Sequence, residues 1–191
     1  MKLSDKALRE VIWVAKTLFE RGKVSGSTAN ISIRVGDSIY ISGTGTCFGT
    51  LSEKDFAIIK NNILMNGVEP SKEYPLHKAM YKNNSAIQAV IHTHSTFSTY
   101  WSCVLSSSPV SIPTPTPYLK MKVGKIGWVD YYQPGSMELF SAFEKAVSKD
   151  TKAYLMKNHG VILGGGSIRE AFYMLEELEE ASKNAWLLSR Q

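Results

Sequence analysis

Two histidines that stand two residues apart, His92 and His94, are the residues whose type and spacing best suit chemistry. They follow an apolar run, 87–91, that is interrupted only by Gln88 and is typical of a buried strand. Side chains two apart in a strand point to the same face, so the two imidazoles can converge on one point. Neutral imidazole is the commonest metal-binding side chain. This motif alone is equally compatible with a metal site and with two hydrogen-bonded histidines at a strand end.

A third histidine, His159, is the candidate that would complete a metal site. It follows a predicted strand over 152–156 and precedes Gly160, where backbone can pack closely. Three imidazoles leave zinc an open position, as catalytic zinc sites do, and the same ligands can accept Mn, Co or Fe. Such a metal can hold two oxygens of a hydroxyketone and stabilise the enediolate formed when an adjacent carbon–carbon bond breaks. The fourth histidine, His77, is expected inside a helix and is interpreted as structural.

A carboxylate that could move a proton near these histidines is Glu73. A helix is predicted from about Glu73 to Lys82, since Pro75 is tolerated in a first helical turn. Ser71 and Lys72 precede it, where free N–H groups and the positive end of the helix dipole favour an anion. Glu73 is therefore a candidate general acid or base, although a glutamate in a first turn is also favourable for purely structural reasons.

A β-hairpin is predicted from two alternating strands, 31–35 and 38–42, joined at Gly36 and Asp37. Its open ends carry small polar residues and glycines over 26–30 and 42–46, and a hairpin brings its open ends together. Backbone N–H groups at glycines, with Ser, Thr and Asn side chains, would form a phosphate cradle. It is not a Walker motif, because no Gly-Lys-Ser/Thr follows, and two ordinary polar loops are the alternative.

Helical and alternating periodicity predicts the remaining elements. Helices are expected over 5–21, 95–105, 137–147 and 168–189, with serines 4, 95, 136 and 167 as their caps, and a second hairpin over 56–65. Three consecutive glycines, 164–166, are interpreted as a break before the last helix. The segment 106–117, rich in Ser, Thr and Pro, is expected to be a stiff loop or a lid.

The composition favours a single domain over 1–191 that acts on a small molecule. The chain is 43% hydrophobic and 20% charged, and its net charge of +5 comes from basic residues that are spread out rather than clustered. This suits a small anionic substrate better than nucleic acid. No apolar run approaches the roughly 20 residues of a membrane helix, and no signal peptide is apparent. Two distant cysteines, Cys47 and Cys103, favour the reducing cytoplasm.

Two other classes of metalloprotein that carry a His-x-His motif fit less well. A metal-dependent amidohydrolase needs a barrel of about 200 residues or more, with the motif near its first strand. Here the motif lies in mid-chain in a protein of 191 residues. A cupin oxygenase needs a glutamate a few residues after the motif, and 95–99 contains no carboxylate.

Five motifs in order along the chain resemble the class II aldolase/adducin family. They lie at 26–30, 42–45, 71–77, 89–95 and 158–160, so the resemblance covers nearly the whole chain. It implies a three-layer α/β/α fold around a central, mixed and largely antiparallel sheet. It also implies a homotetramer with four-fold symmetry and with active sites between subunits.

The resemblance also implies roles for individual residues. His92, His94 and His159 match the zinc ligands, Glu73 matches the acid/base residue, and Ser27, Asn30, Thr44, Gly45 and Ser71 match phosphate-site positions. Tyr118 lies near the place where the aldolases have a tyrosine that reaches the next subunit's site. Two positions depart from the aldolase pattern: Ala29 stands where a glycine is usual, and Lys72 stands where a second serine is usual.

Segments 71–77, 116–118 and 121–124 are closer to the 3-oxo-tetronate 4-phosphate decarboxylases. This implies a zinc-dependent carbon–carbon lyase that forms dihydroxyacetone phosphate through a metal-bound enediolate, with Lys72 pairing with the phosphate or the substrate carboxylate. The alternatives are an L-fuculose phosphate aldolase, a ribulose phosphate 4-epimerase, and a non-catalytic scaffold like adducin.

Overall fold

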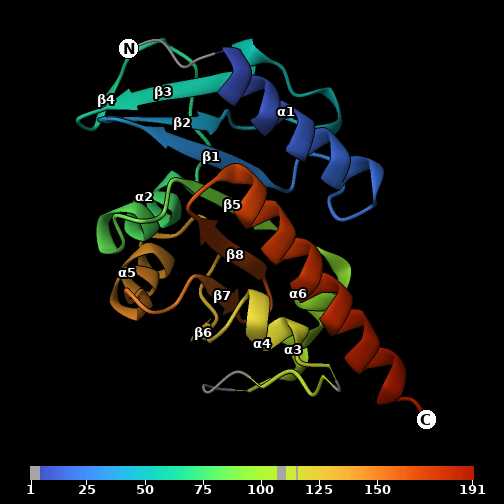
Figure 1. Ribbon diagram of the computed structural model, residues 1–191. Coiled ribbons are helices and arrows are strands. Elements are labelled where there is room, and N and C mark those ends of the chain that lie inside the picture. Colours follow the sequence, from blue (N-terminus) through green and yellow to red (C-terminus); the bar gives the residue numbers. More distant parts are fainter. Residues whose placement is uncertain (1–4, 107–110, 115) are drawn as a thin grey trace.

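The protein is described by a computed structural model that covers residues 5–106, 111–114 and 116–191. In this part of the chain, eight strands form one central sheet (Figure 1). Their spatial order is β4 (Ile63–Leu64), β3 (Phe56–Lys60), β2 (Ser38–Ser42), β1 (Asn30–Val35), β5 (Ala89–Thr93), β8 (Gly160–Gly165), β7 (Ala153–Met156) and β6 (Ile126–Val129). Neighbouring strands pair antiparallel, except that β6 pairs parallel with β7. The predicted mixed, largely antiparallel sheet is confirmed.

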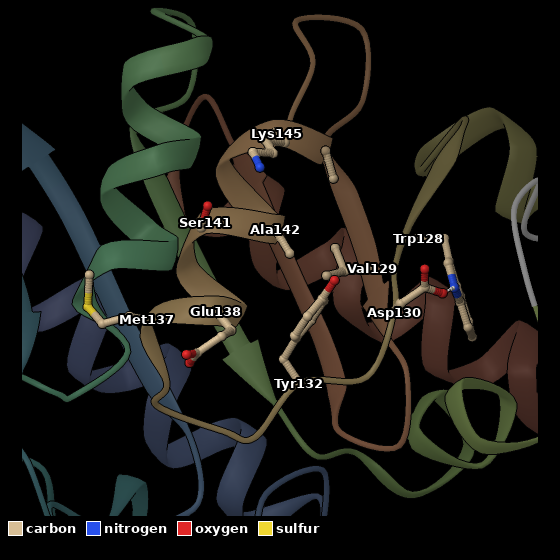
Figure 2. Close-up of a pocket in the computed structure, with 10 residues that line it drawn as sticks. Trp128, Val129, Asp130, Tyr132, Met137, Glu138, Ser141, Ala142 and Lys145 are labelled. Atoms are coloured by element: carbon tan, nitrogen blue, oxygen red, sulfur yellow. Dashed lines mark hydrogen bonds between the residues drawn. The ribbon is translucent and has the colours of Figure 1, made fainter.

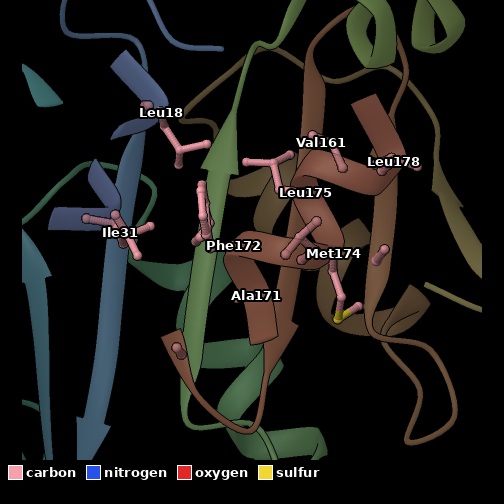
Figure 3. Packing of buried hydrophobic residues seen from close by; sticks show 14 of the residues in the cluster. Leu18, Ile31, Val161, Ala171, Phe172, Met174, Leu175 and Leu178 are labelled. Carbon is pink, nitrogen blue, oxygen red and sulfur yellow. The ribbon is translucent and has the colours of Figure 1, made fainter. Parts of the chain in front are cut away.

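Helices cover both faces of the sheet (Figure 1). One face carries α1 (Asp5–Glu20), α3 (Thr96–Val104), α4 (Tyr118–Lys122) and α6 (Ile168–Leu188), and the other carries α2 (Tyr74–Asn83) and α5 (Met137–Ala146). On the first face, Leu18 of α1, Ile31 of β1 and Phe172 of α6 pack together with no more than 1% exposure (Figure 3). Burying a side chain of this size contributes about 1.5–3 kcal/mol. The three-layer α/β/α arrangement is therefore as predicted.

The alternation of side chains along the two central strands decides which residues reach the functional site. Ile31 of β1 and Ile91 of β5 belong to the core beneath α1 and α6. Their neighbours in the register, Asn30 opposite His92 and Ser32 opposite Val90, therefore point to the face that α2 covers. Polar side chains from two strands thus meet one helix inside an otherwise apolar layer.

Both predicted hairpins are present. Gly36 has a φ of +57° between β1 and β2, and Asn61 and Asn62 have φ of 51° and 65° between β3 and β4. These left-handed conformations are what a tight two-residue turn requires. A short 3₁₀ turn, η1 (Phe48–Thr50), is followed by a second, η2 (Glu53–Asp55), and precedes β3.

Three expectations about helix and strand ends need correction. Ser95 stands at the N-cap of α3, but its side chain does not cap the helix because its Oγ donates to the carbonyl of Lys23. The Glu179 carboxylate of α6 accepts instead from the N–H groups of Phe97 and Ser98, at 2.9 and 2.8 Å. The prediction that glycines 164–166 end the strand is wrong as well, since β8 continues to Gly165. In the capping box at α6, Glu170 accepts from the N–H of Gly166 rather than from the cap residue.

The glycines at the end of β8 serve close packing instead of ending the strand. A Cβ on Gly164 would lie 2.8 Å from Ile87, and one on Gly165 would lie 2.6 Å from the backbone nitrogen of Ala171. The first turn of α6 can therefore approach the sheet. Ser4 and part of the expected 106–117 lid lie outside the described residues, and no described helix has the length and apolarity needed to span a membrane.

Candidate metal centre and anion-binding cavity

Three histidines meet at one edge of the central strands. His92 lies in β5, His94 follows its last residue, and His159 lies in the turn between β7 and β8. Their ring centroids are 5.0 Å apart in each of the three pairs, and their ligand nitrogens lie within 4.8 Å of one another. The Nε2 atoms of His92 and His94 are 3.1 Å apart. The structure therefore brings together the three residues that were predicted from the sequence to be metal ligands.

Local backbone geometry directs His159 towards the other two histidines. Asn158 has a φ of 53°, a left-handed conformation that asparagine tolerates better than most residues. At Gly160, a Cβ would lie 2.5 Å from the carbonyl oxygen of Thr93. A glycine is therefore required for the turn to pack against the end of β5.

The donor set fits a divalent metal. The Nδ1 atom of His92 lies 2.9 Å from the carbonyl oxygen of Val161, which only accepts, so Nδ1 carries a proton and Nε2 is the nitrogen available to a metal. Nδ1 of the buried His159 lacks a hydrogen-bond partner among the described residues, and its Nε2 faces Oε1 of Glu73 at 3.2 Å without making a regular hydrogen bond. His94 is the exposed ligand; partial burial and the imidazoles of His92 and His159 lower the pKa of His94 to about 4, which keeps it neutral near pH 7.

Glu73 faces the same point from the N-cap position of α2. Its Oε2 lies 3.0 Å from Nε2 of His92, and its Oε1 lies 3.2 Å from Nε2 of His159. Burial of the carboxyl raises the pKa of Glu73, but its contacts with His92 and His159 outweigh this and hold the pKa well below its ordinary value. Glu73 is therefore ionised in this arrangement, and it also accepts from Nδ2 of Asn30 at 3.3 Å.

A cavity of about 230 Å³ opens beside the histidines. It is lined by the predicted anion-site residues Ser27, Asn30, Thr44, Gly45, Ser71 and Lys72, together with Glu73, His94 and His159. The two loops behind it are tied by backbone hydrogen bonds, from Thr44 to Glu69 at 3.0 Å and from Ser71 to Ser42 at 3.2 Å. The two open ends of the hairpin and the start of α2 therefore share one cavity.

Two residues that line the cavity were not predicted from the sequence. Pro134 and Gly135 line the same cavity, just before the Ser136 cap of α5. A Pro-Gly pair before a helix cap signals a turn, but nothing local indicates that this turn faces the hairpin loops. Tyr118 does not line the cavity as far as the described residues go; it is 55% exposed at the start of α4, and its role towards a neighbouring subunit stays a prediction.

A larger depression of about 690 Å³ lies along α5 (Figure 2). Trp128, Asp130, Tyr132, Glu138 and Lys145 are among the residues that line it. In the described part of the chain the cluster with metal-binding geometry is the histidine group, which lies outside this depression. We therefore place the candidate active site in the smaller cavity.

Comparisons with known proteins agree with this architecture. Residues 9–186 match the family model for the class II aldolase and adducin N-terminal domain. The chain belongs to the class II aldolase and adducin family. Class II aldolases depend on a divalent metal, for which the histidine cluster is the candidate site.

Relatives with different named activities are similarly close. The chain is 36% identical to 3-oxo-tetronate 4-phosphate decarboxylase of Escherichia coli K12, covering 98% of this chain and 89% of that protein. It is also 36% identical to L-fuculose phosphate aldolase of Methanocaldococcus jannaschii, covering 92% and 93%. Among solved structures, Escherichia coli YgbL, named as an aldolase, epimerase or decarboxylase, superposes with a TM-score of 0.89 at 35% identity, over 96% of this chain and 89% of that one.

Proposed function

We propose that this protein is a metal-dependent carbon–carbon lyase that converts 3-oxo-tetronate 4-phosphate to CO₂ and dihydroxyacetone phosphate. The observation that carries the proposal is the convergence of His92, His94 and His159 beside Glu73, next to a cavity lined by the predicted anion-site residues. The near-full-length similarity to the decarboxylases supports this choice of substrate.

The reaction needs an electron acceptor next to the bond that breaks and a proton for the carbon left behind. A divalent metal held by His92, His94 and His159 would supply the first, by polarising the substrate's 3-oxo group. Glu73 lies within 3.2 Å of Nε2 of His92 and of His159, and we assign it the movement of the proton. Glu73 would act by passing on a proton from solvent to the carbon that has lost CO₂.

The anion end of the cavity would hold the phosphate and the carboxylate. Ser27, Thr44 and Ser71 offer hydroxyl groups, and Gly45 allows close backbone approach to an oxygen. Lys72 is exposed at the cavity and carries the positive charge that a substrate with two anionic groups requires. We assign Lys72 to one of these two groups.

We further propose that the metal is zinc, because three imidazoles with an open position are a common catalytic zinc site. A single domain over 1–191, a homotetramer in which Tyr118 reaches a neighbouring subunit's site, and a cytoplasmic location complete the proposal. The two free cysteines, Cys47 and Cys103, accord with a reducing compartment.

The test is product analysis with two substrates. Metal-loaded protein is incubated with 3-oxo-tetronate 4-phosphate, and CO₂ and dihydroxyacetone phosphate are measured; a parallel reaction contains L-fuculose 1-phosphate. The proposal expects equal amounts of both products from the first substrate and little cleavage of the second. Cleavage of fuculose phosphate without CO₂ release from the keto acid would identify an aldolase, the alternative that the archaeal relatives favour. Absence of bound metal together with inactivity on both would identify a scaffold.

A further inference from the structure

A continuous row of buried hydrogen bonds lies behind Glu73. The hydroxyl of Tyr81 is 2.7 Å from Oγ of Ser32, and the same Oγ is 2.7 Å from Nδ1 of His77. Nε2 of His77 contacts Oδ1 of Asn30, whose Nδ2 donates to Oε2 of Glu73. Ser32 and His77 are fully buried, and Tyr81 and Asn30 are 4% and 6% exposed.

The row forms because polar residues recur along α2 and along β1 at nearly the same distance. His77 and Tyr81 of α2 and the N-cap residue Glu73 are spaced by four, so they follow one face of the helix and rise about 6 Å per step. Asn30 and Ser32 are spaced by two in β1 and advance by about 6.8 Å on one face of the sheet. The two polar rows therefore stay in step, and each strand residue lies between two helix residues.

The charge on Glu73 sets the direction of every hydrogen bond in the row. A carboxylate only accepts, so the amide group of Asn30 faces it and Oδ1 of Asn30 faces His77. Nε2 of His77 must then donate, Nδ1 must accept from the hydroxyl of Ser32, and Ser32 must accept from Tyr81. Burial lowers the pKa of His77 to about 3 and raises the pKa of Tyr81 well above its ordinary value, so neither group changes protonation near neutral pH.

The row gives a role to buried polar side chains that take no direct part in the reaction. Both polar ends of the Asn30 side chain are engaged, one by Glu73 and one by His77, although Asn30 also lines the cavity. A buried polar group that loses its partner costs about 1–3 kcal/mol, so each link disfavours rotation of the next. The carboxylate of Glu73 is thereby held where it faces Nε2 of His92 and of His159.

We propose that Asn30 and His77 are positioning residues for Glu73, and that Ser32 and Tyr81 fix the tautomer and orientation of His77. The assignment rests on the proposed role of Glu73 in moving the proton. It changes the interpretation of His77, which the sequence indicated only as a helix residue of structural importance.

The kinetic test compares two substitutions at one position. His77→Gln keeps a donor towards Asn30 and is expected to retain turnover within about threefold. His77→Leu fills the space without a donor and is expected to lower kcat by about 10- to 100-fold, with KM and bound metal nearly unchanged. Equal kcat values for the two variants, or a loss expressed only in KM, would overturn the proposal.

A matched pair of serine variants separates positioning from general destabilisation. Ser32 and Ser102 are both fully buried, and each hydroxyl makes a hydrogen bond of 2.7 Å. Ser32→Ala is expected to lower kcat by about five- to tenfold, whereas Ser102→Ala, outside the row, is expected to leave it within twofold. An equal loss of kcat in both variants would show that the row has no special connection to Glu73.

A crystal structure of the His77→Leu protein gives a result that needs no turnover. The proposal expects the Glu73 carboxylate to have left its contacts with His92 and His159, while the histidines themselves stay in place. An unmoved carboxylate would overturn the positioning role. If the unaltered protein fails to decarboxylate the keto acid, the proposed function fails, and this crystal structure still decides the inference about Glu73.

Discussion

At the metal end of the cavity the candidate reacting groups lie at or directly beside the ends of strands and a helix, whereas the anion end is made largely of exposed loops. His92 and His159 are buried, and the Glu73 carboxylate contacts both of them and Asn30. Ser27, Thr44, Gly45 and Lys72 are exposed, and Gly45 has a φ of +73°. Groups on regular elements are held more exactly than groups on loops. Loops can therefore change substrate preference while the reacting groups stay fixed, which fits a family whose relatives carry different named activities.

The largest effect is expected from removing a metal ligand. His94→Ala should abolish metal binding and lower activity by at least about a thousandfold, since two imidazoles are too few for a stable site. Because His94 is the exposed member of the cluster, the fold should survive. Metal content by mass spectrometry and circular dichroism test this together. One metal retained per folded chain would show that the histidines are not the ligands.

Glu73→Gln should have the next largest effect. The amide keeps the shape of the side chain but cannot take up a proton, so kcat should fall by about 10²- to 10⁴-fold. Metal content should remain at the level of the unaltered protein, because Glu73 is not needed as a ligand. Steady-state rates and metal analysis of the same preparation test both statements. Near-normal turnover would exclude Glu73 as the group that moves the proton.

A substitution at the anion end should act on binding instead of chemistry. Lys72→Gln should raise KM by about tenfold, the loss of one charge-assisted contact, and leave kcat within about threefold. The KM of the unaltered protein should also rise more steeply with salt than that of the variant. A fall in kcat with an unchanged KM would mean that Lys72 belongs to the metal end, and the contrast between the two ends would be lost.

The smallest effect near neutral pH concerns stability. An unfolded His77 would have a pKa near 6.5, and the folded residue has a pKa of about 3. Between these values the unfolded chain binds a proton that the folded chain does not, so the free energy of unfolding falls as the pH is lowered. His77 adds a slope of at most about 1.4 kcal/mol per pH unit. Urea unfolding of the unaltered protein and of His77→Gln between pH 7 and 4 should show the shallower slope in the variant, and equal slopes would contradict the assignment.

Local patterns predicted much of the site because its motifs lie at element ends. A period of two placed His92 and His94 together, and hairpin geometry placed 26–30 beside 42–46. The parts that could not be predicted depend on contacts between distant segments. Glu179 caps α3 from 81 residues away, and the parallel pairing of β6 with β7 has no signature in a strand of four residues. His77 was recognisable as a helix residue, but its link to Glu73 depends on how α2 meets β1.

The most direct test of the central claim is the release of CO₂ from 3-oxo-tetronate 4-phosphate as metal is added back to stripped protein. We predict no release from the metal-free protein, and a rate that rises in proportion to bound metal until one ion is present per chain. The His94→Ala protein should not respond. Metal-free protein that forms CO₂ and dihydroxyacetone phosphate at the full rate would contradict the account.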